Sequence, residues 1–319
     1  MKICLVGEGA FGKKHLLSLR KIEDVEISVL VGGEADSTKL LANEYNIPFW
    51  TLDLQEGLAQ PGIEAAILAT PTPIHAAQAI EVMQAGKHVE IEIPMADSLV
   101  DAEKVVAKKK ETGLIAMVGH TRRFNPSHQW IRQRMKKGEL KLQHLDVQTF
   151  FFRRTNTNAE GNPRSWTDHL LWHHACHTVD LFQYQTNEVV SEIQAMQGPI
   201  HPELGIAMDM SFLLKVPSGA MCSLTLSFNN DGPLGTFFRY ICDNGTYIAR
   251  YDDLIDGYDN QIDLSNIDVS MNGLELQDRE FINAIREGRE PNGSVLQVFP
   301  AMETLHRLEQ YLERESKSK

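Results

Sequence analysis

Histidine and acidic side chains are concentrated between Asp168 and Asp180, in the segment DHLLWHHACHTVD. Residues four apart on an α-helix lie on the same face, so His169, His173 and His177 would share one face of a helix. Imidazole groups with a pKa near neutrality transfer protons at physiological pH, which makes this segment a candidate catalytic centre. Three histidines beside a carboxylate could instead bind zinc, and neutral histidines packed in a core are the third interpretation.

A second candidate site lies at the N-terminus, where an apolar run leads into the segment GEGAFG. When a GxGxxG pattern follows a strand and opens a helix, it is typical of a dinucleotide-binding turn. Gly7 allows the tight turn, Gly9 lets the backbone approach a pyrophosphate, and Gly12 allows the helix to pack closely on the strand. A purely structural glycine turn is the alternative. The residues expected to contact the dinucleotide here are Gly7, Gly9, Ala10, Phe11 and Gly12.

The choice between NAD and NADP depends on the end of the next apolar run, Glu26–Val31. Enzymes that use NAD usually place an acidic residue there, which accepts a hydrogen bond from the ribose 2′-hydroxyl. This chain has Gly32 and Gly33 instead, and the nearest acid, Glu34, comes slightly later. We therefore expect NADP, with NAD and Glu34 in the place of that acid as the alternative. The side chains that could donate to a 2′-phosphate are Ser37, Thr38 and Lys39.

Both candidate sites need a scaffold, and the N-terminal one lies in a regular alternation of apolar runs and helical patterns. Continuous Val, Ile and Leu character is typical of parallel strands that are covered on both faces. The alternation predicts an α/β fold with a doubly wound parallel sheet, a Rossmann domain, over residues 1–120. The expected strands are Lys2–Gly7, Glu26–Val31, Ala65–Thr70, His88–Glu92 and Ile115–Gly119, and the expected helices are Gly12–Lys21, His75–Ala85 and Leu99–Thr112.

The chain changes character from Gln143 onward, where apolar and polar residues alternate. This alternation predicts a largely antiparallel sheet in an α+β domain over residues 121–319. The open face of the sheet is a predicted subunit contact, so we expect a homo-oligomer, a dimer or a tetramer. The expected strands are Leu145–Arg153, Met210–Val216 and Ala220–Phe228, and the expected helices are Pro126–Lys137, Trp172–Gln185 and Ser294–Glu313, the last packing back against the body.

The composition disfavours several classes of partner. The 319 residues include 43 acidic and 31 basic side chains, for a net charge of −12, and no basic stripe is present, so nucleic acid is not expected. No apolar run approaches the roughly 20 residues that a membrane span needs. The chain opens on a predicted strand and not on a basic leader. Four scattered cysteines without a CxxC pair favour free thiols in a reducing cytoplasm.

Two motifs at the ends of later strands carry a resemblance to a known family. The segments TPTPIH (Thr70–His75) and GKHVEIEIP (Gly86–Pro94) resemble the glucose–fructose oxidoreductase and inositol dehydrogenase family. In that family the first motif lies along the nicotinamide and its ribose, and the second ends in Glu-Lys-Pro, whose lysine assists proton transfer. The lysine is replaced by Ile93 here, which disfavours simple sugar or polyol oxidation. The resemblance implies cofactor contacts from Thr70, Pro71, Thr72, His75, Glu92, Ile93 and Pro94.

Longer segments resemble the members of this family that oxidise ring-cleavage semialdehydes in the bacterial protocatechuate 4,5-cleavage route, by which lignin-derived aromatics are degraded. The resemblance implies an NADP-dependent oxidation of a cyclic hemiacetal that carries two carboxylates, which yields the lactone 2-pyrone-4,6-dicarboxylate. The alternatives are a sugar or polyol dehydrogenase of the same family and a non-catalytic NADP sensor. The segments are Gly119–Gln129, Pro163–Phe182, Gly198–Ser211, Ser227–Thr246 and Gln277–Asn292.

The family pattern also implies roles within the histidine segment. His177 matches the catalytic histidine, while His173 and Ala175 stand where the family has aspartate and glycine. We expect His177 to be the general base, His173 to be its partner or substitute, and Asp180 to orient the helix that carries them. No metal is expected, because hydride transfer from a hemiacetal does not need one, and zinc remains the alternative.

A dicarboxylate substrate requires fixed cations that bind carboxylates through two hydrogen bonds. Arg122 and Arg123 lie just past the last predicted strand of the parallel sheet, at the predicted domain junction. The carboxyl edge of such a sheet is where ligands bind. The expected substrate contacts are Arg122, Arg123, Asn125, Arg164 and His169, with Arg153 and Arg239 as further candidates.

Overall fold

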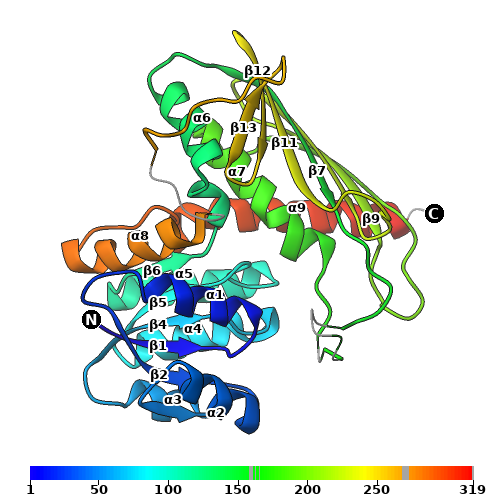
Figure 1. Ribbon diagram of the computed structural model, residues 1–319. Coiled ribbons are helices and arrows are strands. Elements are labelled where there is room, and N and C mark those ends of the chain that lie inside the picture. The colour runs from blue at the N-terminus through cyan, green and yellow to red at the C-terminus, as the bar shows by residue number, and fades with distance from the viewer. Residues whose placement is uncertain (158–160, 162, 165, 268–272, 318–319) are drawn as a thin grey trace. The chain divides into compact units, whose positions relative to one another are not determined.

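The computed structural model describes residues 1–157, 161, 163–164, 166–267 and 273–317. The chain forms two compact units (Figure 1). The first comprises Met1–His120 and Leu274–Phe299, and the second comprises Thr121–Gly273 and Pro300–Lys319. The sequence pattern assigns every residue after 120 to the second domain. Leu274–Phe299 nevertheless belongs to the first unit, because helix α8 (Leu274–Glu287) packs there against α1 (Ala10–Leu19).

The first unit is built on a six-stranded parallel sheet with the order β3-β2-β1-β4-β5-β6. The chain order reverses at β1, which has β2 and β4 as its neighbours, and such a switch point marks where α/β sheets bind ligands. The sheet confirms the predicted doubly wound fold, although β3, only three residues long, lacked an apolar run that would have predicted it. The strands are β1 (Lys2–Val6), β2 (Glu26–Val31), β3 (Phe49–Thr51), β4 (Ile63–Leu68), β5 (His88–Ile91) and β6 (Ala116–Val118).

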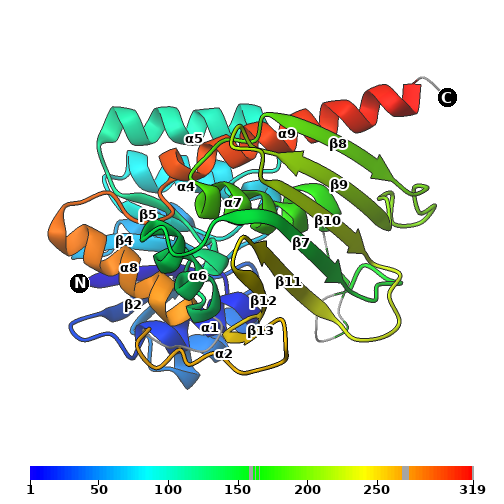
Figure 2. The ribbon, with the colours of Figure 1, turned by 90° about the horizontal axis from the view of Figure 1, so that it is seen from above.

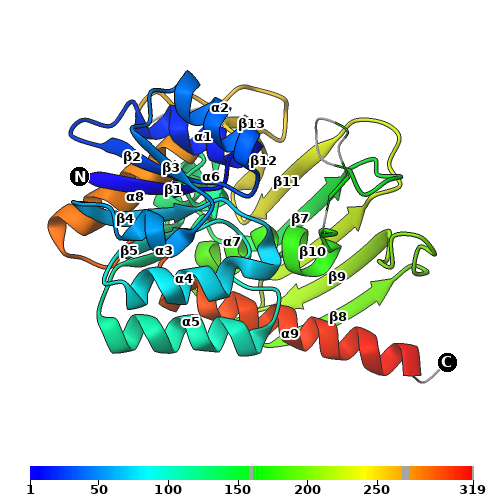
Figure 3. The same ribbon diagram turned by 90° about the horizontal axis from the view of Figure 1, so that it is seen from below.

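The helices of the first unit begin and end where the sequence provides capping residues. In α5 (Leu99–Thr112), Ser98 accepts a hydrogen bond from the Asp101 amide, and Gly113 ends the helix in the left-handed conformation with φ 70°. Helices α4 and α5 lie side by side (Figure 3). The other helical segments are α2 (Ala35–Glu44), α3 (Leu54–Leu58), η1 (Thr72–Ile74) and α4 (His75–Gln84).

The second unit is built on a seven-stranded sheet with the order β13-β12-β11-β7-β10-β9-β8, of which Figure 2 shows β8, β9, β10, β7 and β11 side by side. All neighbouring strands are antiparallel except β7 and β10, which run parallel, so the prediction of a largely antiparallel sheet is confirmed. The strands are β7 (Leu142–Phe150), β8 (Glu192–Gln197), β9 (Asp209–Lys215), β10 (Met221–Ser227), β11 (Gly235–Cys242), β12 (Gly245–Arg250) and β13 (Asp253–Asp256).

One face of this sheet is covered and the other is open. Buried and more exposed residues alternate along β9 and β10, because successive side chains of a strand point to opposite faces. Helical segments pack against the covered face. They are η3 (Leu170–Ala175), α7 (Cys176–Thr186) and α6 (Pro126–Lys136), while η2 (Thr121–Arg123) precedes α6 and α9 (Val295–Lys317) ends the described chain.

The histidine segment does not form the regular α-helix that the sequence pattern predicts. Leu170–Ala175 is a π-helical segment, and the α-helix begins only at Cys176. His169 lies before the first turn, where its ring nitrogen Nδ1 accepts a hydrogen bond from the Leu171 amide at 3.1 Å. Because a π-helix winds more widely than an α-helix, the spacing of four residues does not align His169, His173 and His177 on one α-helical face.

Two further observations bear on the chemistry available. All four cysteines are free and buried, and burial raises the pKa of Cys4 to about 12 and that of Cys242 to about 11. These thiols are therefore protonated and unreactive at neutral pH. In the described ranges, no helix has both the length and the apolar character that a bilayer crossing requires.

Candidate functional site

The glycine loop of the first unit has the geometry that a dinucleotide needs. Gly7 adopts φ +114°, and a Cβ there would lie 2.3 Å from the carbonyl oxygen of Ala69. A Cβ on Gly12 would lie 1.9 Å from the carbonyl oxygen of Gly7, so both positions require glycine. A Cβ on Gly9 meets nothing within 4 Å, which leaves open space beside the loop. Gly9 is also the N-cap of α1 and has no side chain to cap it, so the first amides of the helix can bind an anion.

Glu8 connects this loop to the turn after β2. Its carboxylate oxygens accept hydrogen bonds from the Gly33 amide at 3.0 and 3.1 Å and from the Glu34 amide at 3.1 Å. The Ser37 hydroxyl lies 3.3 Å from the same carboxylate. The sequence pattern placed Gly33 and Ser37 at the turn expected to meet the ribose of the cofactor but gave Glu8 no role, because a contact between the glycine loop and this turn has no local signal in the sequence.

The side chains of Glu34 and Thr38 both form hydrogen bonds within the same turn. The Glu34 carboxylate caps α2 by accepting hydrogen bonds from the amides of Ser37 at 2.7 Å and Asp36 at 3.1 Å, and these bonds lower the pKa of Glu34. Thr38 is buried and its hydroxyl donates to the Glu34 carbonyl oxygen. A Cβ on Gly32 would lie 1.8 Å from the Thr38 hydroxyl oxygen, so Gly32 makes room for that side chain. Of the three side chains predicted to donate a hydrogen bond to a 2′-phosphate, Thr38 thus already donates its hydrogen bond within the protein.

His75 joins the two later motifs of the first unit. One ring nitrogen lies 2.7 Å from the Thr70 carbonyl oxygen and the other lies 2.8 Å from the Pro94 carbonyl oxygen. The peptide bond between Ile93 and Pro94 is cis. Burial lowers the pKa of His75, and its contacts tie the end of β4 to the segment after β5. The structure therefore brings together the residues around Thr70 and Pro94 that the family resemblance implies for the cofactor.

Glu92 belongs to a buried network that the sequence did not predict. His15 Nε2 lies 3.0 Å from Glu92 Oε1, and His15 Nδ1 lies 2.8 Å from Asp278 Oδ1. Burial lowers the pKa of His15, but the neighbouring Asp278 and Glu92 raise it more, so it lies well above its ordinary value. The charge and hydrogen bond of His15 in turn offset the effect of burial and lower the pKa of Glu92. His15 follows Gly12 by three residues, so this spacing on the buried face of α1 is the only local signal for it.

Glu90 and Gln277 complete this network. Gln277 Nε2 donates to Glu90 at 2.9 Å and to Glu92 at 3.3 Å, while burial and the charge of Asp278 raise the pKa of Glu90 to about 8. Within the described part of the chain, the three potential metal-ligand atoms that lie within 4.8 Å of one another belong to His15, Glu90 and Asp278, and not to the histidines around η3. Both nitrogens of His15 already face carboxylates, which is the arrangement of a hydrogen-bonded ion-pair network.

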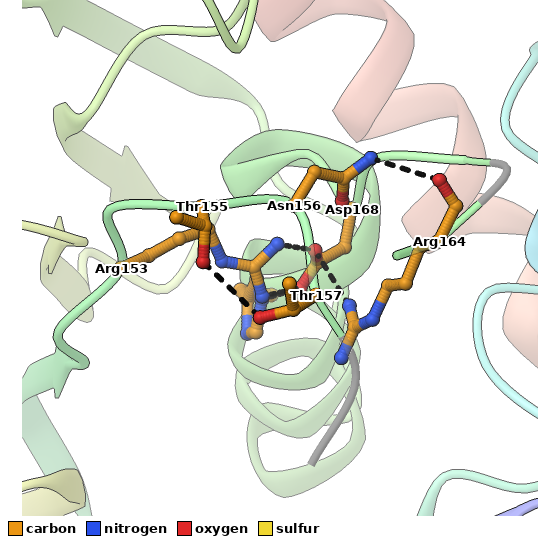
Figure 4. Close-up of polar contacts among 7 residues, drawn as sticks. Arg153, Thr155, Asn156, Thr157, Arg164 and Asp168 are labelled. Atoms are coloured by element: carbon orange, nitrogen blue, oxygen red, sulfur yellow. Dashed lines mark hydrogen bonds and ion pairs between the residues drawn. The ribbon is translucent and has the colours of Figure 1, made fainter. Parts of the chain in front are cut away.

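In the second unit, the carboxylate of Asp168 binds two arginines, as Figure 4 shows, and also contacts a histidine. Arg153 binds the carboxylate through both of its terminal nitrogens, with Nη2 2.7 Å from Oδ2. Arg164 Nη1 reaches Oδ1 from the other side at 3.1 Å. His174 Nε2 lies 3.1 Å from Oδ2. The Asp168 side chain is 5% exposed, whereas those of Arg153 and Arg164 are 15% and 24% exposed. The two arginine side chains are therefore more accessible to solvent than the carboxylate that they share.

Among the described residues of this cluster, the positive and negative charges do not cancel. Burial, Arg153 and Arg164 together lower the pKa of His174 to about 3, so this histidine is neutral at pH 7. Burial and Arg164 lower the pKa of Arg153 to about 10, which still leaves Arg153 positively charged. Two cations thus share one carboxylate. His174, to which the sequence pattern gave no role, contacts Asp168 through its ring nitrogen Nε2.

The predicted proton-transfer residues lie next to this cluster in the chain. The His173 ring contacts Trp166 and His174, with ring centroids 5.5 and 5.2 Å away. His177 lies in the first turn of α7, and both His173 and His177 are half-buried. His169, by contrast, uses Nδ1 to cap the segment, and burial lowers its pKa.

Arg122 and Arg123 are adjacent in sequence but have opposite environments. Arg123 is buried and forms a two-point ion pair with Asp180, at 2.8 Å from Nε and 2.6 Å from Nη2. The pair joins η2 to α7 and so holds in place the helix that carries His177. Because each side chain is the ion-pair partner of the other, both are occupied. The guanidinium of Arg122 instead packs on Tyr251 and Phe238, with its central carbon 4.9 and 5.8 Å from the ring centroids.

Asn125 holds Arg122 in this environment. Its side-chain oxygen accepts a hydrogen bond from Arg122 Nη1 at 3.3 Å, while its side-chain nitrogen donates to Asp252 at 2.7 Å. Burial lowers the pKa of Arg122, yet the group remains cationic at neutral pH. The Asn125 amide and the two rings fix the position of the Arg122 guanidinium, and the nearby Tyr251 and Asp252 partly offset the effect of burial on its pKa. A cation held in one position in this way can bind an anion.

Comparison with known proteins agrees with the division into two units. Residues 1–120 match the family described as "Oxidoreductase family, NAD-binding Rossmann fold", and residues 126–268 match "Bacterial oxidoreductases, C-terminal". The chain is 61% identical, over 99% of its length and 100% of the relative, to 4-carboxy-2-hydroxymuconate-6-semialdehyde dehydrogenase of Sphingobium sp. (strain NBRC 103272 / SYK-6).

Solved structures show the same fold. Levoglucosan dehydrogenase in complex with NADH and levoglucosan superposes with a TM-score of 0.86 at 17% identity, over 99% of this chain and 97% of the other. An oxidoreductase from Agrobacterium radiobacter in complex with NAD+, L-tartaric acid and magnesium gives a TM-score of 0.82 at 15% identity, over 98% and 96% of the two chains. The chain therefore belongs to the oxidoreductase family with an NAD-binding Rossmann fold, that of the glucose–fructose oxidoreductases and inositol dehydrogenases, and is a dehydrogenase that uses a nicotinamide dinucleotide.

Proposed function

We propose that this protein oxidises 4-carboxy-2-hydroxymuconate-6-semialdehyde, as its cyclic hemiacetal, to 2-pyrone-4,6-dicarboxylate. The observation that carries the proposal is the 61% identity, over 99% of the chain, to a dehydrogenase named for this semialdehyde. In the reaction the hemiacetal carbon loses a hydride and its hydroxyl group loses a proton, so that the C–O bond becomes the carbonyl of the lactone. The protein must therefore bind a dinucleotide, accept a proton and hold two carboxylates.

The first unit supplies the dinucleotide site in this proposal. The nicotinamide dinucleotide, when bound, takes up the hydride. Gly9 and the first amides of α1 would hold its pyrophosphate, because the open space beside Gly9 and the uncapped helix start fit an anion there. The segments that His75 ties together, around Thr70 and Pro94, are assigned to the nicotinamide end.

We assign the proton to His177, with His173 as its partner or substitute. Both rings are half-buried and belong to the segment that starts at η3. His174 is unsuited to this role because its pKa of about 3 makes it a very weak base at neutral pH. Asp180 is a positioning residue in this scheme, since its ion pair with Arg123 anchors α7.

The two carboxylates of the substrate are assigned to two separate groups of cations. Arg122, which Asn125 and two aromatic rings hold in position, is assigned to one carboxylate. Arg153 and Arg164 share Asp168, so this group, as far as the structure describes it, keeps one excess positive charge for the other carboxylate. Asn125 positions Arg122, and His169 supports the segment from its N-cap position. Arg123 is not proposed as a substrate contact, because its guanidinium is paired with Asp180.

The preference between NAD and NADP is a finer part of the proposal. The missing acid directly after β2 favours NADP. The structure places the carboxylates of Glu8 and Glu34 at that same turn, which favours NAD. Because both carboxylates are already hydrogen-bonded to backbone amides of this turn, NADP stays the proposed cofactor and NAD its alternative.

Two properties of the whole protein belong to the same proposal. We expect a homo-oligomer that assembles through the open face of the seven-stranded sheet, where Met196, Leu213 and Met221 are 75%, 47% and 40% exposed. Apolar side chains gathered on an open sheet face favour a subunit contact. We also place the protein in the cytoplasm, since its free, buried cysteines suit a reducing compartment.

The direct test is an assay with the ring-cleavage product of protocatechuate. Purified protein is mixed with the semialdehyde and either dinucleotide, the absorbance of the reduced cofactor is followed, and the product is identified by NMR as the lactone. Reduction coupled to lactone formation is expected. If the semialdehyde is inert and a sugar alcohol is oxidised, the protein is a polyol dehydrogenase. If dinucleotide binds but neither substrate is oxidised, the protein is a sensor.

A further inference from the structure

A hydrogen bond joins the π-helical segment η3 to helix α9. The indole nitrogen Nε1 of Trp172 donates to Glu309 Oε1 at 2.7 Å. Trp172 is 4% exposed, and a buried indole N–H usually finds an acceptor. Because the acceptor here is a carboxylate, the bond belongs to the stronger, charge-assisted class. The two residues are 137 positions apart in the chain, so only the folded protein brings them together.

Trp172 lies in the middle of a segment whose winding is unusual. π-Helices are rare and occur mostly as single turns, frequently at functional sites. Trp172 directly precedes His173 in this segment, and His177 lies in the first turn of α7, which continues from η3. The winding of η3 therefore decides where both imidazoles lie. A contact that holds Trp172 in place also holds that winding.

Helix α9 is anchored on both sides of the glutamate that accepts the indole hydrogen bond. On one side, the two terminal nitrogens of Arg307 donate to the carbonyl oxygens of Val190 at 2.6 Å and Ser191 at 2.9 Å. On the other side, the Tyr311 hydroxyl donates to Gln194 Oε1 at 2.6 Å. The carboxylate is thus presented from a helix with attachments of its own, and the indole hydrogen bond transmits this fixed position to η3.

We propose that Glu309 is a positioning residue for proton transfer, which acts through Trp172 to fix the winding of η3 and with it the imidazoles of His173 and His177. The inference rests on the proposed function, since it takes these two histidines as the proton-transfer groups. Glu309 contacts neither substrate nor cofactor in this scheme. Loss of its hydrogen bond is therefore expected to lower kcat and to leave the binding of both ligands largely unchanged.

The test removes each end of the hydrogen bond in turn. Trp172→Phe removes the donor and keeps an aromatic ring, and Glu309→Leu removes the acceptor. Each is expected to lower kcat by about 10- to 100-fold, because small displacements of catalytic groups have effects of this size. The KM for the semialdehyde and the Kd for the dinucleotide should stay within about threefold. The double variant should be no slower than the slower single variant, because both changes remove the same bond.

Glu309→Gln is the conservative variant, since its amide oxygen can accept the same hydrogen bond, and it is expected to recover most of the kcat lost in Glu309→Leu. Glu303→Leu is the matched control, because Glu303 is an exposed acid on the same helix. Its kcat should stay within about twofold of the wild type. Melting temperatures and titration with the dinucleotide give the fraction of folded protein, so that kcat refers to folded enzyme alone.

Three results would overturn the proposal. The first is a kcat near that of the wild type in both Trp172→Phe and Glu309→Leu. The second is an additive loss in the double variant, because the two side chains would then act independently. The third is an equal loss in Glu309→Gln and Glu309→Leu, which would assign the effect to the charge and not to the hydrogen bond.

A measurement without substrate separates this proposal from the proposed function. In ¹H–¹⁵N NMR spectra of the full-length protein, the ring signals of His173 and His177 can be assigned with His173→Gln and His177→Gln. These signals are expected to shift in Trp172→Phe and Glu309→Leu and to stay in place in Glu303→Leu. Unmoved ring signals in the first two variants would refute the positioning role whatever the substrate is. Failure of the proposed function would instead appear in the semialdehyde assay of the wild-type protein.

Discussion

The two units each contain a polar cluster, and the clusters differ in charge balance and burial. In the first unit, His15 lies between Glu92 and Asp278, and the side chains of His15 and Asp278 are fully buried. In the second unit, Arg153 and Arg164 share Asp168, and both guanidinium groups are partly exposed. A buried charge cluster must be compensated from within, because water cannot solvate it. A partly exposed cluster with an excess of cations is free to bind an anion. The contrast suggests a structural role for the first cluster and a ligand-binding role for the second.

The largest expected effect concerns His177, beside the second cluster. In the variant His177→Gln we expect kcat to fall by about 10²- to 10⁴-fold, since the proposed proton acceptor is removed. The Kd for the dinucleotide should stay unchanged, because that site belongs to the first unit. Steady-state kinetics with the semialdehyde and calorimetric titration with the cofactor measure the two quantities. A kcat within threefold or so of the wild type would transfer the role to another group, and His173→Gln would then be the next variant to measure.

Removal of the cation from the first cluster should instead reduce stability. His15→Leu leaves Glu92 and Asp278 without their shared partner, and we expect the free energy of unfolding to fall by about 3 to 5 kcal/mol. Urea denaturation followed by circular dichroism measures the change. His174→Leu is the matched control in the second unit, because Asp168 keeps both arginines, and its cost should be about 1 kcal/mol. Equal losses in both variants would remove the distinction between the clusters.

Removal of a cation from the second cluster should weaken substrate binding. In Arg164→Met we expect the KM for the semialdehyde to rise by about 10- to 100-fold, which corresponds to roughly 1.5 to 3 kcal/mol for a hydrogen bond to a charged group. The KM for the dinucleotide should not change. Arg122→Met is expected to behave in the same way. Arg123→Met should instead destabilise the fold, because it leaves the buried carboxylate of Asp180 without its ion-pair partner. If Arg164→Met loses stability and retains its KM, the second cluster is structural as well.

The last expected effect is a dependence of stability on pH. The pKa of Glu90 is raised to about 8 in the folded protein from an ordinary value of 4.5, so the folded state holds a proton that the unfolded state has lost between these values. The pKa of His15 is also raised, so the stability that it contributes is complete below its ordinary value of 6.5 and is lost as the pH rises through its folded pKa. Both groups make the free energy of unfolding fall as the pH rises from pH 5 to pH 8. Urea titrations across this range should show a flatter profile for Glu90→Gln, and an unchanged profile would mean that Glu90 titrates normally.

Much of the fold is predictable from local patterns in the sequence. The continuous apolar runs of the first unit indicated its parallel strands, because both faces of that sheet are covered. Ser98 and Gly113 marked the ends of α5 because a cap and a left-handed residue are local requirements. The glycine loop was equally predictable from the sequence, since Gly7 and Gly12 are required by contacts within the loop or with the end of the adjacent strand.

The charge partners are decided by tertiary structure alone. Asp278 lies 263 residues from His15 and Asp180 lies 57 residues from Arg123, so no spacing in the sequence announces either pair. The same holds for Glu8, which accepts a hydrogen bond from a turn 25 residues away. The sequence by itself thus determined which backbone shapes form, because steric and periodic constraints act between near neighbours. Which cations remain uncompensated was decided only when the folded chain brought distant charges within hydrogen-bonding distance.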